Sequence, residues 1–153
     1  MCATGAGHRQ QPKRYESANN GHTLIVDPSL SIGVLANTVT AIGIGIGTAA
    51  PVLGNTRLTD ARGLAVTTSA KWPVPILQAE ADTMRELLLN AVPVSADATV
   101  VVFPQFARKV HHFDEYLAAF PTRDLSAEKL DGIGLLGPAA WLKSLTGGLK
   151  LLR

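Results

Sequence analysis

The stretch LDGIGLLGP, residues 130–138, gives the clearest indication of the fold. Glycines space its apolar residues up to Gly137, and this pattern predicts a strand. Pro138 suits the first turn of a helix, and the next residues, AAWLKSLTG, predict a short helix that Gly147 and Gly148 end. The final residues, LKLLR, predict a short extended segment. The chain is therefore expected to close with a strand, a helix and a second extended piece.

The same order of strand and helix recurs before this stretch. Further strands are predicted at residues 23–27, 74–79 and 98–103, each followed by a helical pattern. The β-branched run of the third, ATVVVF, predicts a strand at the centre of the sheet that is buried on both faces. Residues 50–73 are rich in turn signals and predict a long connection with a small hairpin. We therefore expect a three-layer α/β/α sandwich with about four strands in a mixed or mainly parallel sheet.

Length and composition indicate one folded domain. With 153 residues, of which 46% are apolar and 17% charged, the chain can bury most of its apolar surface in a single core. We expect residues 22–153 to form this domain. Residues 1–21 are expected to be a flexible N-terminal tail, because they are polar and lack the apolar segment of a secretory signal. No membrane span is expected, because glycine, threonine and asparagine interrupt the apolar run at residues 30–54.

Charge and cysteine content exclude several classes of function. The formal charge of +2 is too small to indicate a nucleic-acid partner, although the basic leader could touch RNA. The single cysteine, Cys2, excludes an internal disulfide and a cysteine-based zinc site. This count fits a reducing compartment. We expect a cytoplasmic protein without a metal or another cofactor.

The glycines in AIGIGIGTAAPVLGN, residues 41–55, raise the question of a phosphate-binding loop. In a dinucleotide fold such glycines lie between a strand and the N-terminus of its helix. Here Gly43, Gly45 and Gly47 come at the far end of the first helix, and the segment has no Walker lysine. Close packing and a helix end explain these glycines better than a phosphate site.

The first helix is predicted to be apolar on two sides. The side expected to face the sheet comprises Ile32, Leu35, Val39, Ile42 and Ile46. The opposite side comprises Val34, Asn37, Ala41 and Ile44. An exposed apolar strip often marks an interface, so we expect a homodimer through this second side, with Asn37 paired across a two-fold axis. The alternative is a cover from within the chain, either the helix at residues 105–120 or the long insert.

Residues 105–121, QFARKVHHFDEYLAAFP, predict a single amphipathic helix. Its apolar face comprises Phe106, Val110, Phe113, Leu117 and Phe120. The adjacent His111 and His112 diverge on such a helix, so they do not converge on one metal ion. His111 and Glu115 have a spacing that could, but an exposed pair of this kind is typical of solvated surface.

The end of the chain, LDGIGLLGPAAWLKSLTGGLKLLR, resembles the final strand and helix of the peptidyl-tRNA hydrolase II fold. The matching features are Gly137-Pro138, Thr146-Gly147 and Leu149-Lys150-Leu151. Over residues 22–153 the chain is more similar to the domain of unknown function 2000 family. The shared features are the LANT segment of the first helix, an Asp-x-x-Gly loop and this terminal pattern. The resemblance implies a peptidyl-tRNA hydrolase II-like fold.

The resemblance does not extend to the catalytic residues of the hydrolases. The lysine, glutamine and histidine that the hydrolases carry on the first helix fall on Gly33, Asn37 and Thr40. Their catalytic aspartate falls on Pro104, and the hydroxyl positions of their last strand fall on Leu130 and Gly132. No acid, base or cation remains at these positions to activate water or to hold a phosphate. We therefore expect a non-hydrolytic relative, a binding protein rather than an enzyme.

A sparse set of polar residues remains as a candidate ligand site at the ends of the strands. These candidates are Asp27, Asn37, Thr40, Asp60 and Gln105. Each also has a structural explanation, since Asp27 before Pro28 is a common turn pair and Asp60 suits an ordinary turn. Three functions stay open: binding of a small ligand or a protein partner, hydrolysis of peptidyl-tRNA or a related acyl ester by a rearranged site, and a homo-oligomeric structural module.

Overall fold

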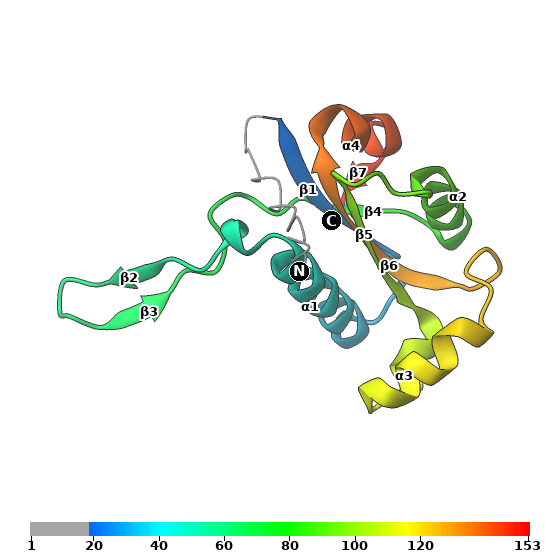
Figure 1. Cartoon of the computed structure of the whole chain (residues 1–153), viewed down its shortest axis with the longest axis horizontal. Helices are drawn as coiled ribbons and strands as arrows, with labels where there is room; N and C mark the ends of the chain where they lie inside the picture. The colour runs from blue at the N-terminus through cyan, green and yellow to red at the C-terminus, as the bar shows by residue number, and fades with distance from the viewer. Residues whose placement is uncertain (1–18) are drawn as a thin grey trace, which may run out of the picture.

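A computed structural model describes residues 19–153 of the chain. The main sheet has five strands in the order β5-β6-β1-β4-β7 (Figure 1). They are β1 (Asn20–Val26), β4 (Ile76–Gln78), β5 (Thr99–Pro104), β6 (Leu130–Pro138) and β7 (Lys150–Leu151). β1 and β4 run parallel, whereas β6 is antiparallel to both β1 and β5, and β7 is antiparallel to β4. The expectation of a mixed sheet is confirmed and that of a mainly parallel sheet is wrong, because β6 enters between β1 and β5 in the opposite direction.

Helices cover both faces of this sheet (Figure 1). α1 (Ile32–Ala49) packs on one face, where Ile42 and Ile46 meet Leu24 and Leu136. On the other face lie α2 (Ala81–Ala91) and α4 (Ala139–Thr146), while α3 (Phe113–Ala119) extends from one end of the molecule. Three short 3-10 turns complete the helical segments: η1 (Pro51–Leu53), η2 (Gln105–Lys109) and η3 (Phe120–Thr122).

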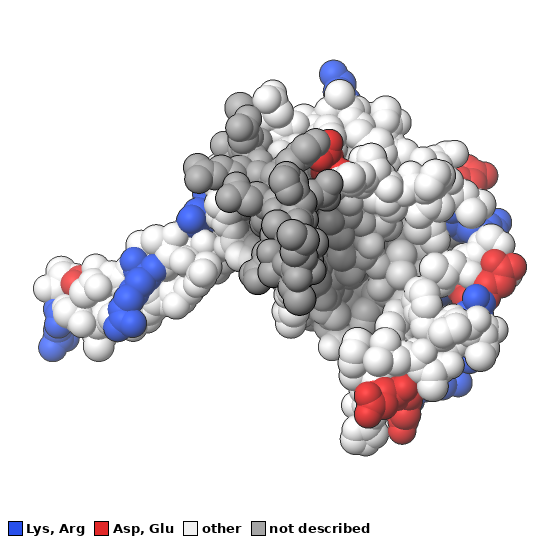
Figure 2. Space-filling model, viewed as in Figure 1, with Lys and Arg blue, Asp and Glu red and all other residues white. Residues whose placement is uncertain are grey.

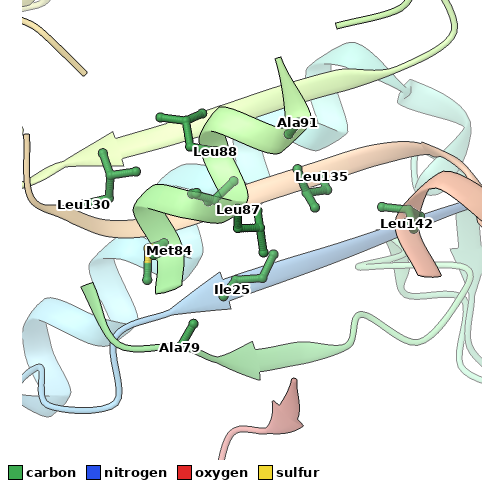
Figure 3. Close-up of a cluster of buried hydrophobic side chains, with 10 residues drawn as sticks. Ile25, Ala79, Met84, Leu87, Leu88, Ala91, Leu130, Leu135 and Leu142 are labelled. Carbon is green, nitrogen blue, oxygen red and sulfur yellow. The ribbon is translucent and has the colours of Figure 1, made fainter. Parts of the chain in front are cut away.

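The larger core lies between the sheet and α2. The face of α2 predicted by its periodicity, Met84, Leu87, Leu88 and Ala91, is buried as expected. Figure 3 shows these side chains in one cluster with Ile25 of β1 and Leu130 and Leu135 of β6. This cluster fixes α2 across the two central strands.

The glycines of β6 decide how closely α1 approaches the sheet. A Cβ atom on Gly132 would lie 2.8 Å from Cγ2 of Thr38 and 2.7 Å from Cδ1 of Ile42. A Cβ atom on Gly134 would overlap Ile42 and lie 3.1 Å from Cγ1 of Ile46. Because real Cβ atoms do not approach so closely, α1 can lie directly on β6 only where the strand has glycine.

The predicted position of the run ATVVVF is wrong. The run forms β5 as a strand, but β5 is the edge of the sheet and its residues Thr99 to Phe103 are only half-buried. The central strand is β6, whose residues from Leu130 to Gly137 are all buried. A β-branched run predicts a strand, but its neighbours in the sheet depend on pairing between distant segments.

The predicted single helix at residues 105–121 is also wrong. The chain forms η2, becomes extended at Val110 and His112, and then forms α3. This break brings the ring of Phe106 to 5.6 Å from the ring of Tyr116, in a stacked pair. In one continuous helix these residues would be about 15 Å apart along the axis. Aromatic packing therefore favours two short helical pieces over one long helix.

The predicted sheet-facing side of α1 is correct only in part. Ile42 and Ile46 are buried, but Ile32 is 87% exposed. Thr38, which was not predicted to face the sheet, is fully buried. The first turn of α1 thus extends beyond the sheet, and Ile32 does not join the core there. By length and composition α1 could also cross a membrane, but in the fold it contributes to the core beside the sheet.

The long insert contains the predicted hairpin, formed by β2 (Arg57–Thr59) and β3 (Ala65–Thr67). The hairpin projects away from the rest of the molecule (Figure 1). At the other boundary, β1 begins at Asn20, inside the segment expected to be the N-terminal tail. Residues 1–18 of that predicted tail lie outside the described residues.

Candidate functional site

Four charged side chains meet where β1 ends and β6 begins. Asp27 and Asp131 are adjacent, since the Asp27 N–H donates to the Asp131 carbonyl at 3.1 Å. Asp27 Oδ2 lies 3.9 Å from Nζ of Lys129, and Arg108 donates from Nε and Nη2 to the two carboxylate oxygens of Asp131. Two acids thus face two bases, so the cluster is balanced in charge.

The pair of Arg108 and Asp131 is the strongest polar contact of this cluster. The Asp131 side chain is fully buried, whereas the Arg108 side chain keeps 32% of its surface exposed. The hydrogen bond to Asp131, and then the negative charges of Asp131 and Asp27, raise the pKa of Arg108 above its usual value despite partial desolvation. A buried carboxylate that is bound on both oxygens by one guanidinium holds structure together and has little capacity left for a substrate.

The structure brings two of the five predicted site residues to this end of the sheet. Asp27 is buried, and its Oδ1 accepts hydrogen bonds from N and Oγ of Ser29 at 2.8 and 2.6 Å, which closes the predicted turn. Gln105 follows β5, and its N–H donates to the Lys129 carbonyl at 2.8 Å. Both residues therefore anchor loops at the cluster.

The other three predicted residues do not join this site. Asn37 and Thr40 are exposed on α1, and Thr40 Oγ1 donates to the Ala36 carbonyl of its own helix at 2.8 Å. Asp60 lies in the turn of the distant hairpin, where Oδ1 accepts the N–H groups of Arg62 and Leu64 at 2.9 and 2.8 Å. Thr40 and Asp60 thus have local roles, in their own helix and in their own turn.

Sequence reasoning missed Arg108, Lys129 and Asp131. One signal was present, because an aspartate inside the apolar strand at residues 130–138 needs a partner if it is buried. The identity of that partner was not visible, since Arg108 lies in a segment that was expected to be a regular helix. Among residues 19–153, no group of three or more His, Cys, Asp or Glu side chains could hold a metal ion.

A pocket of about 430 Å³ lies at the opposite end of β1, beside the C-terminal half of α1. Its wall is largely apolar and includes Leu24, Ile46, Leu53 and Val74. Among residues 19–153, the polar side chains in the lining are those of His22, Asn55 and Ser69. A mostly apolar cavity with a few hydrogen-bonding groups has the composition of a site for a small organic molecule.

The glycines that suggested a phosphate loop form part of this pocket. Gly43 and Gly47 line it, and no atom lies within 4 Å of the position where either would carry a Cβ. Gly45 points the other way, where a Cβ would lie 2.9 Å from Cγ1 of Val101. Gly43 and Gly47 thus leave open space in the pocket, whereas Gly45 permits close packing of α1 on β5.

His22 is the titratable group of this pocket. It lies on β1, half-buried, two residues before Leu24. Burial lowers the pKa of His22 below 6.5, and a hydrogen bond to the backbone of Pro73 opposes the shift only in part. The imidazole is therefore neutral near pH 7, which suits contact with an uncharged or weakly polar ligand.

The depressed pKa of His22 makes stability depend on pH. The unfolded chain binds the proton more readily than the folded chain, so the contribution of neutral His22 is complete above 6.5 and is lost as the pH falls through the folded-state pKa. We expect the free energy of unfolding, measured by urea titration, to decrease from about pH 7 to about pH 5 more steeply in the wild type than in His22→Asn. Equal slopes in the two proteins would contradict this assignment.

The structure defines a small three-layer α/β domain with a charged cluster at one end of β1 and a largely apolar pocket at the other. A family model described as a protein of unknown function, DUF2000, matches residues 22–153, and the chain belongs to this family. This agrees with the family resemblance of the sequence.

One solved structure shares the fold. It is the protein of unknown function Atu0240 from Agrobacterium tumefaciens strain C58, with a TM-score of 0.80 and 15% sequence identity. The similarity covers 88% of this chain and 98% of that protein. At this identity it supports the architecture alone, and the peptidyl-tRNA hydrolase II-like assignment stays a prediction. No curated protein matches the chain.

Proposed function

We propose that the chain is a non-hydrolytic relative of the peptidyl-tRNA hydrolase II fold that binds a small, mostly apolar molecule in the pocket beside α1. The observation that carries this proposal is the open space at Gly43 and Gly47, where α1 forms one wall of the pocket. The volume of about 430 Å³ lies within the range of about 300–1,000 Å³ usual for small-molecule sites. The ligand is expected to have an apolar body and one hydrogen-bonding group.

Electrostatics supports an uncharged ligand. In the lining, His22 is the side chain that titrates near neutral pH, and its lowered pKa keeps it neutral. Asn55 and Ser69 add neutral donors and acceptors. Among the described residues of this lining there is no cation to offset the lost hydration of a phosphate or a carboxylate.

The proposal predicts that a side chain at Gly47 blocks the pocket. Gly47→Leu should weaken binding of 2-naphthol, an aromatic alcohol of suitable size, by at least about tenfold because the leucine occupies the cavity. Binding is measured by nuclear magnetic resonance, from the saturable shift of the amide signals of His22 and Gly43. Gly33→Leu is the matched control, since Gly33 lies on the same helix, also has open space at its Cβ position, and does not line the pocket.

The two variants decide between specific binding and general hydrophobic contact. If 2-naphthol shifts do not saturate in the wild type, or if Gly33→Leu loses binding as much as Gly47→Leu, the pocket is not the ligand site. Retained binding in Gly47→Leu contradicts the proposal as well.

A hydrolase with a rearranged site is the alternative function. It would have to use the charged cluster of Asp27, Arg108, Lys129 and Asp131, in which carboxylates and cations already engage one another. Incubation with labelled peptidyl-tRNA tests this alternative. Turnover within the common enzymatic range of about 1–1,000 per second would establish it and overturn the binding proposal.

A further inference from the structure

The projecting hairpin exposes apolar side chains that the rest of the described chain, residues 19–153, does not cover. Leu58, Leu64 and Val66 are 49%, 66% and 61% exposed. Leu58 and Val66 are directly opposite in the register of β2 and β3, so they lie on the same face of the hairpin. All residues of both strands are exposed, and the hairpin thus presents a continuous apolar face to its surroundings.

A two-stranded hairpin without a covering layer is marginally stable in water. Asp60 strengthens the turn by accepting two backbone N–H groups, but this contact covers none of the apolar face. Burial of exposed Leu and Val side chains is favourable, so a surface that covers this face would also order the hairpin. The hairpin therefore has the form of an arm that requires a receiving surface.

A suitable receiving surface lies at α3. A groove of about 460 Å³ runs between the half-buried edge strand β5 and α3, and its wall includes Phe113, Tyr116 and Leu117. Phe113 and Leu117 are 70% and 54% exposed. α3 has no buried residue and is held mainly by the aromatic contacts among Phe106, Tyr116 and Phe120. The groove is thus apolar, and its outer wall is incompletely packed.

Charge is complementary between the hairpin and this groove. The hairpin carries Arg57 and Arg62 against one acid, Asp60, whereas the first turn of α3 carries Asp114 and Glu115. In Figure 2 the blue groups on the projecting hairpin and the red groups over α3 lie at opposite ends of the molecule. An apolar face that carries two arginines therefore matches a groove whose helix, α3, carries two acids in its first turn.

The hairpin and the α3 groove cannot meet within one chain, because they project from opposite ends of its long axis (Figure 1). We propose that two copies of the chain form a two-fold symmetric dimer in which the hairpin of each copy lies in the β5–α3 groove of the other. Along the long axis α1 lies between the two elements (Figure 1). An antiparallel arrangement of two copies beside α1 places both pairs in contact at once, as an isologous interface requires. The uncharged exposed side of α1, which includes Asn37 and the 66% exposed Ile44, then faces the partner.

Two complementary charge reversals test this dimer. The arm variant is Arg57→Glu with Arg62→Glu, and the groove variant is Asp114→Lys with Glu115→Lys. Each variant alone places like charges together in both contacts, and its dimer dissociation constant should rise at least about tenfold relative to the wild type. In an equimolar mixture, the heterodimer has one native contact and one contact with both charges reversed. The mixture should therefore form a one-to-one heterodimer with affinity near that of the wild type.

Sedimentation velocity and native mass spectrometry measure these species, because the two variants differ in mass. Lys143→Glu with Lys150→Glu is the matched control, since it changes the net charge as the arm variant does but lies on α4 and β7. It should dimerise like the wild type. All substitutions are at exposed positions, and circular dichroism verifies that each variant is folded.

Three outcomes would overturn the proposal. In the first, the wild type is a monomer at about 100 μM, so the apolar face of the hairpin would be a contact for residues 1–18 or for a different protein. In the second, both reversed variants dimerise like the wild type, which places the interface elsewhere. In the third, the mixture stays monomeric although each variant has lost its dimer, which removes the reciprocal contact.

Discussion

Replacing Arg108 by alanine is expected to lower the free energy of unfolding by about 3–5 kcal/mol. Asp131 has no exposed side-chain surface, and both of its carboxylate oxygens accept hydrogen bonds from Arg108. Without the guanidinium, a charged carboxylate stays buried at the start of the central strand and its desolvation is uncompensated. Urea-induced unfolding, followed by circular dichroism, measures the difference.

The double variant Arg108→Ala with Asp131→Asn provides the control. It removes the buried charge together with its partner, so it should be more stable than Arg108→Ala alone. Lys129 is nearby but contacts Asp27 at 3.9 Å, so it does not replace Arg108. A loss below about 1 kcal/mol in Arg108→Ala would show that the pair behaves like a surface ion pair.

Replacing Gly134 by alanine is expected to lower the free energy of unfolding by about 1–3 kcal/mol. The added methyl group would overlap Ile42 and lie within 3.1 Å of Ile46, both of which are buried side chains of α1. Relief requires α1 to move away from β6, which opens the packing along their whole contact. Thermal unfolding measures the loss as a decrease in the melting temperature.

Gly43→Ala is the matched control for this change. Gly43 lies in α1 with no atom within 4 Å of its Cβ position, so a methyl group there meets no obstacle. Because alanine favours helix over glycine by about 0.5–1 kcal/mol, this variant should be more stable than the wild type. A loss of stability in Gly134→Ala together with a gain in Gly43→Ala would support this account of the packing. A Gly134→Ala variant more stable than the wild type would contradict it.

The sequence indicated the role of Gly134 more directly than the pairing of Asp131 with Arg108. Gly134 belongs to a stretch whose glycine spacing predicted a strand, and the structure adds that Gly132 and Gly134 face α1. Asp131 is in the same stretch, but its partner Arg108 follows the break between β5 and α3. A charge inside an apolar strand signals that a partner exists, and only the folded chain supplies it.

Local patterns were sufficient for much of the architecture. The strand and helix that end the chain, the buried face of α2 and the hairpin in the insert follow from residues that are close in sequence. Apolar periodicity and turn residues act over a few positions, so these elements could be predicted without knowledge of their neighbours. The family resemblance rests on the same local signals.

The sequence by itself determined the alternation of strands and helices and the mixed α/β class. Tertiary structure alone decided that β5 is an edge, that residues 105–121 break at Val110 and His112, and that Asn37, Thr40 and Asp60 lie apart from Asp27. It also decided that Gly43 and Gly47 line a pocket while Gly45 meets Val101. The physical reason is that strand order, aromatic stacking and cavities arise from contacts between residues far apart in the chain, whose energies no local pattern contains.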